Sequence, residues 1–436
     1  MGGSQQPGAS SRRWRLEPRY QIVAVCFLAT FTAYVERVGF SIAFTAMAKD
    51  ANLPESVKGT VLSAFFWGYA VSQIPGGWAA QRYGGRRMLI LCFLLWSAVS
   101  FCTPSDARNT RAIIFARVCI GIAQGFLIPS IHTVLSQWIP PHERARAVTL
   151  TTSGMYLGSA AAMLVLPALA DAFGAPFLLK FVGGQGIAWL LLWLIVGREI
   201  PHRETVIPLT NGDSSGKAPT SKGRPMPTPW RRMMGSPAVW AIVINNFCFH
   251  YAFYVIMNWL PTYFNSVLSV ELSRLGGMKT LPYLVMFLMS NVGGWSGDWL
   301  ILTLKYSVGS GRKTINTLGF LASAVALMVM PGAKGVVGGV MATTFTLGAL
   351  GLSRGGFSVN HMDIAPKYAG MVMGISNTAG TIAGVVGVSF TGVILEWQGG
   401  AGVLTGWYMA HAVAATTCLL ATLVFNALAK GERLFD

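Results

Sequence analysis

The chain alternates between long apolar runs and short polar segments, and this pattern decides its fold class. A membrane-spanning helix needs about 20 apolar residues. The first six runs of about this length cover residues 21–48, 57–81, 88–104, 112–136, 146–170 and 176–196. The second six cover residues 238–266, 275–301, 313–331, 335–358, 367–392 and 403–428. The pattern predicts an all-α membrane protein with twelve transmembrane helices in two six-helix halves.

The polar segments predict how the chain is divided. Between the sixth and seventh runs, residues 197–237 are rich in Pro, Ser, Gly, Lys and Arg, a composition typical of a flexible linker. We therefore expect five parts: a tail (1–20), an N-terminal half (21–196), the linker (197–237), a C-terminal half (238–428) and a second tail (429–436).

The two halves contain a repeated sequence motif. In the first half, the helix that contains Gly77 leads into the basic turn Arg82–Arg87. A degenerate copy follows 217 positions later, as Gly293–Asp298 and then Gly311–Lys313. Duplicated helical halves are typical of secondary transporters, so the repeat favours that class of membrane protein.

The distribution of Lys and Arg predicts the orientation in the membrane, because cytoplasmic loops carry an excess of these residues. If both termini are cytoplasmic, 22 of the 33 basic residues lie in cytoplasmic segments and 6 on the opposite side. The remaining 5 lie within or at the ends of the spans. The alternation needs an even number of spans and excludes a seven-helix receptor.

Composition excludes several other classes of protein. The chain is 53% apolar and 11% charged, whereas a soluble protein averages about 25% charged residues. The net charge of +17 is spread over short loops, so it does not indicate a nucleic-acid partner. The six cysteines fall in or beside apolar runs, and we interpret them as buried small side chains. Metal-ligand spacing, nucleotide loops and nucleophile motifs are all missing, so we expect neither an enzyme nor a bound metal or cofactor.

Several motifs resemble one known family over nearly the whole chain. They are FFWGY at 65–69, QIPGG at 73–77, WLPTYF at 259–264, NHMDIAP at 360–366, GISNTAG at 374–380 and GE at 431–432. These segments resemble the anion transporters of the major facilitator superfamily, which include sialin, the vesicular glutamate transporters, the sodium–phosphate cotransporters and the plant plastid phosphate and ascorbate transporters. Glu36-Arg37 and the segment 153–158 resemble most the plant and algal plastid phosphate-transporter branch. The resemblance implies two six-helix halves around a central site that opens alternately to each side.

Three arginines inside the predicted spans are candidate anion ligands. Charges within a bilayer cost roughly 2.5 to 3.5 kcal/mol each and persist where they face water or a partner. Arg37, Arg117 and Arg354 outnumber Glu36, the clear midspan carboxylate, so the cavity should be positive. The planar fork of arginine matches carboxylate and phosphate oxygens.

The resemblance implies more for some of these arginines than for others. Arg37 matches the family's substrate-binding arginine, and its alternative is pairing between helices. Arg117 matches a family arginine of the fourth helix, and its alternative is a pair with Glu36 or with a carbonyl. Arg354 is unusual for the family, and it either contacts substrate or extends to the membrane interface.

Four uncharged side chains complete the expected substrate site. Gln124 lies two turns after Arg117 and so shares its helix face. Tyr69 faces the cavity in relatives, with an interior aromatic anchor as its alternative. His250 lies near the family's variable substrate-side position, although a buried histidine is more often an interhelical hydrogen-bond donor. Asn377 is the polar candidate of the eleventh helix.

A second group is expected at the cytoplasmic gate. It comprises Gln81, Arg82, Arg86, Arg87, Asp298, His361 and Asp363. We expect Asp298 to brace the loop between the eighth and ninth helices, and His361 and Asp363 to act structurally. Gln81 stands where the superfamily usually has Asp, which weakens one inner-gate ion pair.

The coupling ion is expected to be H⁺ or Na⁺. Proton-coupled relatives carry glutamate where this chain has Gln124, which cannot titrate. If protons drive transport, Glu36 is therefore the candidate carrier, and Na⁺ coupling and uncoupled exchange stay open.

The sequence thus predicts a secondary transporter for a small anion, with phosphate first. An organic anion such as ascorbate, a sugar acid, a dicarboxylate or glutamate is the alternative, and an anion sensor with a transporter fold is the third hypothesis. We expect a monomer surrounded by lipid, in a plastid or other organelle membrane, with the plasma membrane as the alternative.

Overall fold

The computed structural model describes residues 17–53, 55–197, 229–270, 277–278 and 280–435. These residues form fourteen α-helices. The first seven are α1 (Pro18–Asp50), α2 (Glu55–Tyr83), α3 (Gly85–Cys102), α4 (Thr110–Gly125), α5 (Leu127–Trp138), α6 (Arg144–Phe173) and α7 (Ala175–Val196). The others are α8 (Trp230–Met234), α9 (Pro237–Ser266), α10 (Leu281–Leu302), α11 (Val308–Val329), α12 (Gly335–Ile364), α13 (Ala369–Trp397) and α14 (Leu404–Leu428). Most of the predicted tail 1–20 and linker 197–237 lies outside the described residues.

Each of the twelve predicted spans corresponds to a helix or, for the fourth, to the pair α4 and α5. Ten of these segments are long and apolar enough to cross a membrane on that criterion alone, within the described part of the chain. The exceptions are α2 and α10. Several boundaries differ from the prediction by five or six residues, and two of these differences move a motif into a helix. The tenth span continues to Ile364 and so includes Asp363, and the ninth begins at Val308, which places Gly311–Lys313 in its first turns rather than in a loop.

The break between α4 and α5 follows from a proline. Pro129 has no N–H to donate to the carbonyl of Gly125, four residues earlier, so the regular hydrogen-bond ladder is interrupted there. Phe126 between the two helices keeps helical angles, and the pair continues as one span from Thr110 to Trp138.

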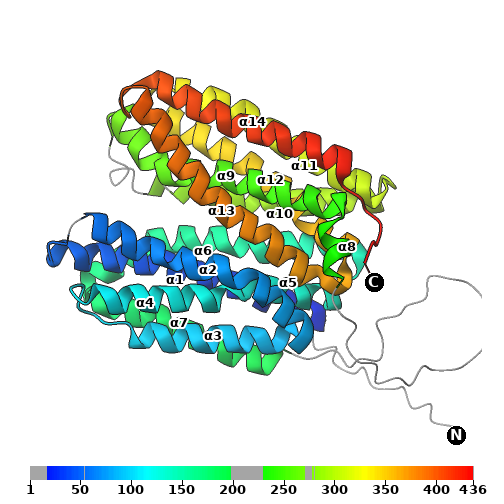
Figure 1. Ribbon diagram of the computed structural model, residues 1–436, viewed down its shortest axis with the longest axis horizontal. Coiled ribbons are helices and arrows are strands. Elements are labelled where there is room, and N and C mark those ends of the chain that lie inside the picture. Colours follow the sequence, from blue (N-terminus) through cyan, green and yellow to red (C-terminus); the bar gives the residue numbers. More distant parts are fainter. Residues whose placement is uncertain (1–16, 54, 198–228, 271–276, 279, 436) are drawn as a thin grey trace, which may run out of the picture.

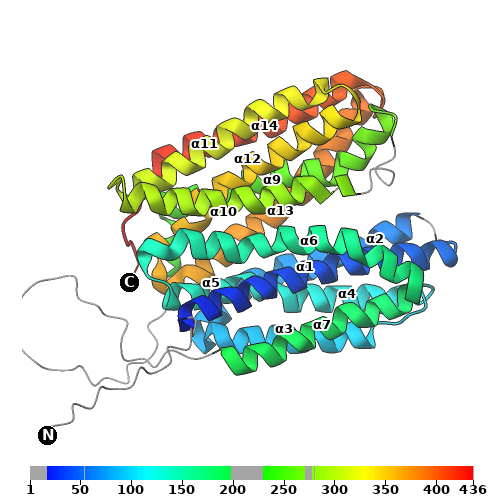
Figure 2. The same cartoon turned by 180° about the vertical axis from the view of Figure 1, so that it is seen from behind.

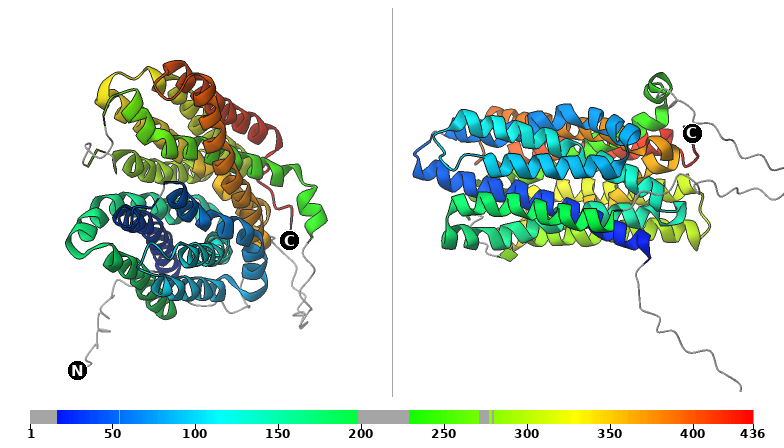
Figure 3. Two further views of the ribbon diagram at one scale, coloured as in Figure 1. Left: turned by 60° about the vertical axis from the view of Figure 1, so that its left-hand side comes forward. Right: turned by 90° about the horizontal axis from the view of Figure 1, so that it is seen from below.

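The helices form two bundles that lie side by side (Figure 1). One contains α1 to α7 and the other α9 to α14, and the view from behind shows α6 and α10 facing each other between them (Figure 2). The left view of Figure 3 shows the two bundles apart. The start of α1 and the ends of α7 and α14 lie at the same end of the molecule, as an even number of spans in each half requires. We call this end cytoplasmic, following the basic-residue bias.

Glycines bring the two halves into contact at the cytoplasmic end. A Cβ at Gly77 of α2 would lie 2.6 Å from the Gly370 carbonyl of α13, and one at Gly374 would lie 2.5 Å from the carbonyl of Gln73. On the other side of the molecule, Gly294 of α10 leaves no room for a Cβ beside Thr149 of α6. These positions allow backbones to approach as closely as small residues permit in lipid, so the cytoplasmic end is closed.

The outer surface suits a lipid environment, because large apolar side chains are exposed along many helices. Examples are Trp67, Phe115, Val325 and Trp397, each more than 60% exposed. The interpretation of all six cysteines as buried is wrong in part. Cys102, at the end of α3, is exposed and Cys119 is partly exposed, whereas the other four are buried.

The exposed Cys102 allows the orientation to be tested. It lies at the end of α3 that is opposite the cytoplasmic end, so a membrane-impermeant thiol reagent added outside cells that display the protein at their surface should label it. Cys102→Ser should abolish labelling, and a second variant, Cys102→Ser with Glu432→Cys, should react only after permeabilisation. Labelling of position 432 from outside intact cells would contradict the predicted orientation.

Candidate functional site

A cavity of about 720 Å³ lies between the two halves. Its lining comes from α1, α2, α6, α9, α10 and α13, including Tyr34, Arg37, Phe66, Tyr254 and Thr381. The lining residues of α1, α6, α9 and α13 lie from about the middle of these helices onward, and those of α2 and α10 lie in the first halves. All of these positions are away from the cytoplasmic end. The cavity therefore belongs to an outward-facing state, with the cytoplasmic end closed.

Arg37 presents the positive charge of this cavity. Its guanidinium lies 4.6 Å from the ring centroid of Tyr34 and 4.5 Å from those of Phe65 and Tyr69, so aromatic faces surround it. Its Nε donates to Gln124 Oε1 at 2.9 Å. No carboxylate of the described chain forms an ion pair with it, so its charge remains available to a ligand in the cavity.

Glu36 points away from the cavity and into the N-terminal half. Arg117 Nη1 donates to Glu36 Oε1 at 2.8 Å, and Gln124 Nε2 donates to Glu36 Oε2 at 2.9 Å. Glu36 is 1% exposed and Arg117 3%. Of the alternatives for Arg117, the structure thus contains the pair with Glu36, and Arg117 does not line the cavity. Gln124 joins the pair to Arg37.

Arg354 is buried rather than extended to the membrane interface. It is 3% exposed, and its Nη1 donates to Tyr156 Oη of α6 at 3.0 Å, which links the two halves. Its guanidinium carbon lies 5.1 Å from the Phe249 ring centroid, and its Nε has no hydrogen-bond partner within the described part of the chain. An arginine held this way, without a carboxylate among the described residues, is a second positive charge at the centre of the molecule.

Arg354 lines a separate inner pocket of about 20 Å³ on the cytoplasmic side of the cavity. Tyr69, His250 and Asn377 line it as well, so the structure brings together four of the predicted substrate residues. We call it the inner pocket. Tyr34, Tyr254 and Thr381 line both the inner pocket and the large cavity, and they form the partition between them.

Below the partition, polar side chains join the halves. Asn377 Nδ2 of α13 donates to Tyr69 Oη of α2 at 3.0 Å and also to Gln73 Oε1. Gln73 Nε2 in turn donates to Thr381 Oγ1 at 3.0 Å. Tyr69 and Asn377 therefore contribute to closure between α2 and α13 as well as to the pocket wall.

The partition tyrosines are site residues that the sequence did not predict. Tyr34 precedes Arg37 by three residues and Tyr254 follows His250 by four, so each shares a helix face with a predicted site residue. This spacing was visible in the sequence and could have identified both.

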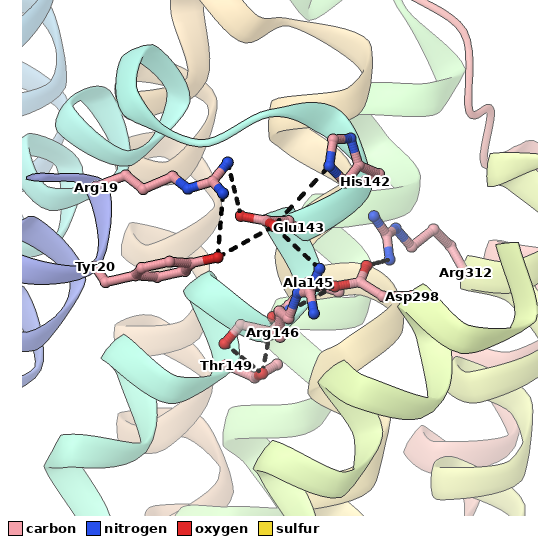
Figure 4. Close-up of polar contacts among 9 residues, drawn as sticks. All are labelled: Arg19, Tyr20, His142, Glu143, Ala145, Arg146, Thr149, Asp298 and Arg312. Atoms are coloured by element: carbon pink, nitrogen blue, oxygen red, sulfur yellow. Dashed lines mark hydrogen bonds and ion pairs between the residues drawn. The ribbon is translucent and has the colours of Figure 1, made fainter. Parts of the chain in front are cut away.

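The cytoplasmic gate is built around Asp298 (Figure 4). Its Oδ2 accepts the backbone N–H of Arg146, in the first turn of α6 in the opposite half, at 3.0 Å. The Arg146 side chain approaches within 3.8 Å, and Arg312 Nη1 lies 3.6 Å from Oδ1. A carboxylate at a helix N-terminus is stabilised by the helix dipole. Asp298 therefore does more than brace a loop, because it holds α6 and α10 together.

The gate continues on both sides of Asp298. Arg312 Nε donates to Asp363 Oδ2 at 3.0 Å, and Arg144 Nη1 donates to the carbonyl of Met362 at 2.9 Å. On the N-terminal side, Glu143 forms an ion pair with Arg146 at 3.3 Å and with Arg19 at 3.4 Å (Figure 4).

The other expected gate residues occupy different positions. His361 Nε2 lies 2.5 Å from Nδ1 of His132 in α5, so these two buried rings contact each other across the halves. Arg86 instead donates to the carbonyl of Gly197 at 2.6 Å, which ties α3 to the end of α7 in the same half. Arg82 lies over the Tyr83 ring at 6.0 Å, beside Gln81 and Arg87 at the α2–α3 turn.

Comparison with known proteins agrees with this geometry. The sequence model of the Major Facilitator Superfamily matches residues 26–388. Over 96% of this chain and 98% of its own length, "Probable anion transporter 5" of Arabidopsis thaliana is 47% identical. The chain belongs to the major facilitator superfamily, in its family of anion transporters. It is a transporter protein and not an enzyme.

Two other Arabidopsis thaliana relatives carry more specific names. "Ascorbate transporter, chloroplastic" is 35% identical, with 97% of this chain and 77% of the relative covered. "Sodium-dependent phosphate transport protein 1, chloroplastic" is 33% identical, with 96% and 80% covered. The solved proton:xylose symporter XylE superimposes with a TM-score of 0.71 at 14% identity, covering 95% of this chain and 97% of that one. This last likeness shows the fold.

Removing the Glu36 carboxylate should destabilise this transporter, because Arg117 would remain buried without a charge partner. Breaking a buried ion pair typically costs roughly 3–5 kcal/mol. We expect Glu36→Gln to lower the melting temperature in detergent, and the double variant Glu36→Gln with Arg117→Gln to recover much of the loss. A double variant no more stable than Glu36→Gln would contradict the pairing as the source of the effect.

Weakening the Asp298 contacts should open the cytoplasmic gate. Hydrogen bonds to charged groups contribute roughly 1.5–3 kcal/mol. Asp298→Asn should therefore raise the ratio of inward-facing to outward-facing molecules by on the order of tenfold. Thr133→Cys, a buried reporter at the closed α5–α13 contact, should then react correspondingly faster with a thiol reagent added from the cytoplasmic side. Asp106→Asn, at an exposed loop on the opposite side, serves as the control, and equal rates in the two variants would count against the gate role.

Proposed function

We propose that the protein is a secondary transporter that moves a small anion, inorganic phosphate first, by alternating access with H⁺ or Na⁺ as the coupling ion. The observation that carries this proposal is Arg37, a guanidinium that lines the cavity and has no carboxylate partner among the described residues. Its two remaining nitrogens, Nη1 and Nη2, suit a phosphate or carboxylate oxygen pair.

The local chemistry supports an anion over a neutral or cationic ligand. Glu36 is already neutralised by Arg117, so it subtracts little from the charge of Arg37. Arg354 adds a second positive charge beyond the partition. The low-dielectric surroundings strengthen the attraction of both arginines for an anion.

An organic anion is the second candidate, and the cavity itself favours it. A volume of about 720 Å³ lined by Tyr34, Phe66, Phe253 and Tyr254 has more room and more aromatic surface than phosphate needs. Ascorbate, a sugar acid, a dicarboxylate or glutamate would use that surface. The two relatives named for ascorbate and for phosphate are similarly distant from this chain. Competition of each unlabelled anion against labelled phosphate uptake distinguishes the candidates.

A sensor that binds without transport is less favoured, because the closed gate consists of separable ion pairs rather than a permanent plug. The proposed setting is a plastid or other organelle membrane, with the plasma membrane as the alternative. The proposed functional unit is a monomer, because one chain contains both halves of the cavity. Counterflow exchange in proteoliposomes would contradict the sensor hypothesis.

Replacing Arg37 tests the proposed anion contact. Arg37→Lys retains the positive charge but loses the planar fork, and we expect uptake of labelled phosphate in proteoliposomes to fall at least tenfold while the protein stays folded. Arg37→Ala should abolish uptake. Arg108→Ala, at an exposed loop position, should retain wild-type uptake. Wild-type uptake by folded Arg37→Ala would disprove the role of Arg37.

A further inference from the structure

The ring of His250 lines the inner pocket, and one of its nitrogens carries no hydrogen. Its Nδ1 lies 2.9 Å from the backbone carbonyl of Asn246, one helical turn earlier. A carbonyl oxygen can only accept, so Nδ1 carries the hydrogen, and Nε2 of the neutral ring carries a lone pair. Nε2 has no hydrogen-bond partner among the described residues, and the ring lines the inner pocket.

Packing fixes the ring in this orientation. A Cβ at Gly380 of α13 would lie 2.6 Å from His250 Nδ1, so the ring has room in this position only because residue 380 is a glycine. Gly384, one turn later, leaves room for the Tyr254 ring in the same way. The small-residue spacing of α13 thus positions both the histidine and one wall of the partition.

We propose that His250 takes up the coupling proton at Nε2 when an anion enters the inner pocket beside Arg354. This inference rests on the proposed transport function and names its proton site. The proton comes from water of the outward cavity, adds to the Nε2 lone pair, and later leaves from the same nitrogen to the cytoplasmic side.

The charges around His250 make proton and anion binding depend on each other. Arg354 is the charged residue of the inner pocket, and its positive charge opposes a second one on His250. An anion between them removes that repulsion, so each ligand increases the affinity for the other by the same factor. The remaining groups of the lining are uncharged at neutral pH: Tyr34 of α1, Tyr69 of α2, Ile128 of α5, Met155 of α6, Tyr254 of α9, and Met373, Asn377 and Thr381 of α13. The histidine of α14, His411, faces Tyr263 instead.

The size of the inner pocket determines when the proton binds relative to the movement of the anion. The inner pocket, at about 20 Å³, has room for about one water molecule in the outward-facing state. An anion can enter only when Tyr34 and Tyr254 of the partition move, which brings the anion from Arg37 toward Arg354. Proton uptake by His250 then accompanies that movement and not the first encounter in the open cavity. Release follows when the Tyr69–Asn377 contact between the halves separates.

Glu36 is poorly placed for the same task. Both of its oxygens already accept hydrogen bonds, from Arg117 and Gln124, and it lines neither the cavity nor the inner pocket. Protonation would leave Arg117 buried without a counter-charge. We therefore assign Glu36 to orienting Gln124 and, through it, Arg37. This assignment differs from the ion-coupling role that the sequence predicts for Glu36.

The test counts protons per anion in proteoliposomes. Wild type, His250→Gln and His411→Gln are compared for entry of labelled inorganic phosphate and for proton entry reported by an entrapped pH dye, at zero membrane potential and one pH. His411 is the matched control, because its Nδ1 also lies 2.8 Å from an i−4 carbonyl while the ring lines neither pocket. We expect the ratio to fall by about one proton per phosphate in His250→Gln and to stay at the wild-type value in His411→Gln. An unchanged ratio in His250→Gln overturns the proposal.

A second measurement needs no substitution at the site. In the wild-type protein with ¹⁵N-labelled histidine, adding phosphate at constant pH should convert one imidazole to the doubly protonated form. If no imidazole becomes doubly protonated, the proposed role of His250 is overturned. If the wild type moves neither phosphate, ascorbate nor malate, the proposed transport function is wrong. If it takes up an anion without protons, only the proposed role of His250 is wrong.

Discussion

A buried chain of hydrogen bonds in the N-terminal half is the constraint on which the site depends. Arg117, Glu36, Gln124 and Arg37 follow one another through three contacts of 2.8 to 2.9 Å. In a medium of low dielectric constant, each member is costly to leave unpaired, so the chain fixes the rotamer of its last member. Arg37 thereby reaches the cavity in a defined orientation, before any ligand has contributed binding energy.

The two sides of the inner gate are held by different forces. Between α6 and α10, Asp298 joins the halves through a helix N-terminus and two arginines. Between α2 and α13 the contact consists of glycines, with Gln73, Tyr69 and Asn377 supplying neutral hydrogen bonds. Gln81, near the cytoplasmic end of α2, is uncharged, which fits this difference. Salt and membrane potential therefore act on one side of the gate far more than on the other.

The sequence predicted the twelve spans because long apolar runs and the positive-inside bias are properties of local composition. It identified Arg37, Arg117 and Arg354 as charges inside the spans for the same reason. It could not predict the different environment of each arginine. Whether an arginine contacts Glu36, Tyr156 or an open cavity depends on contacts between helices far apart in the chain. The tautomer of His250 likewise required the Asn246 carbonyl and the opposing glycine to be placed in space.

The break at Pro129 divides the fourth span into α4, which carries Arg117 and Gln124, and α5, which carries His132. A span without one continuous hydrogen-bond ladder can bend at that point. The cytoplasmic segment could then swing with the gate while the outer segment keeps its register with α1. Such a joint would allow the inner gate to open without disturbing Arg37, so the anion contact proposed for Arg37 would be the same on the two sides of the membrane. Equal binding on the two sides gives a carrier that can run in either direction, and the combined gradients of the anion and of any coupled ion decide which.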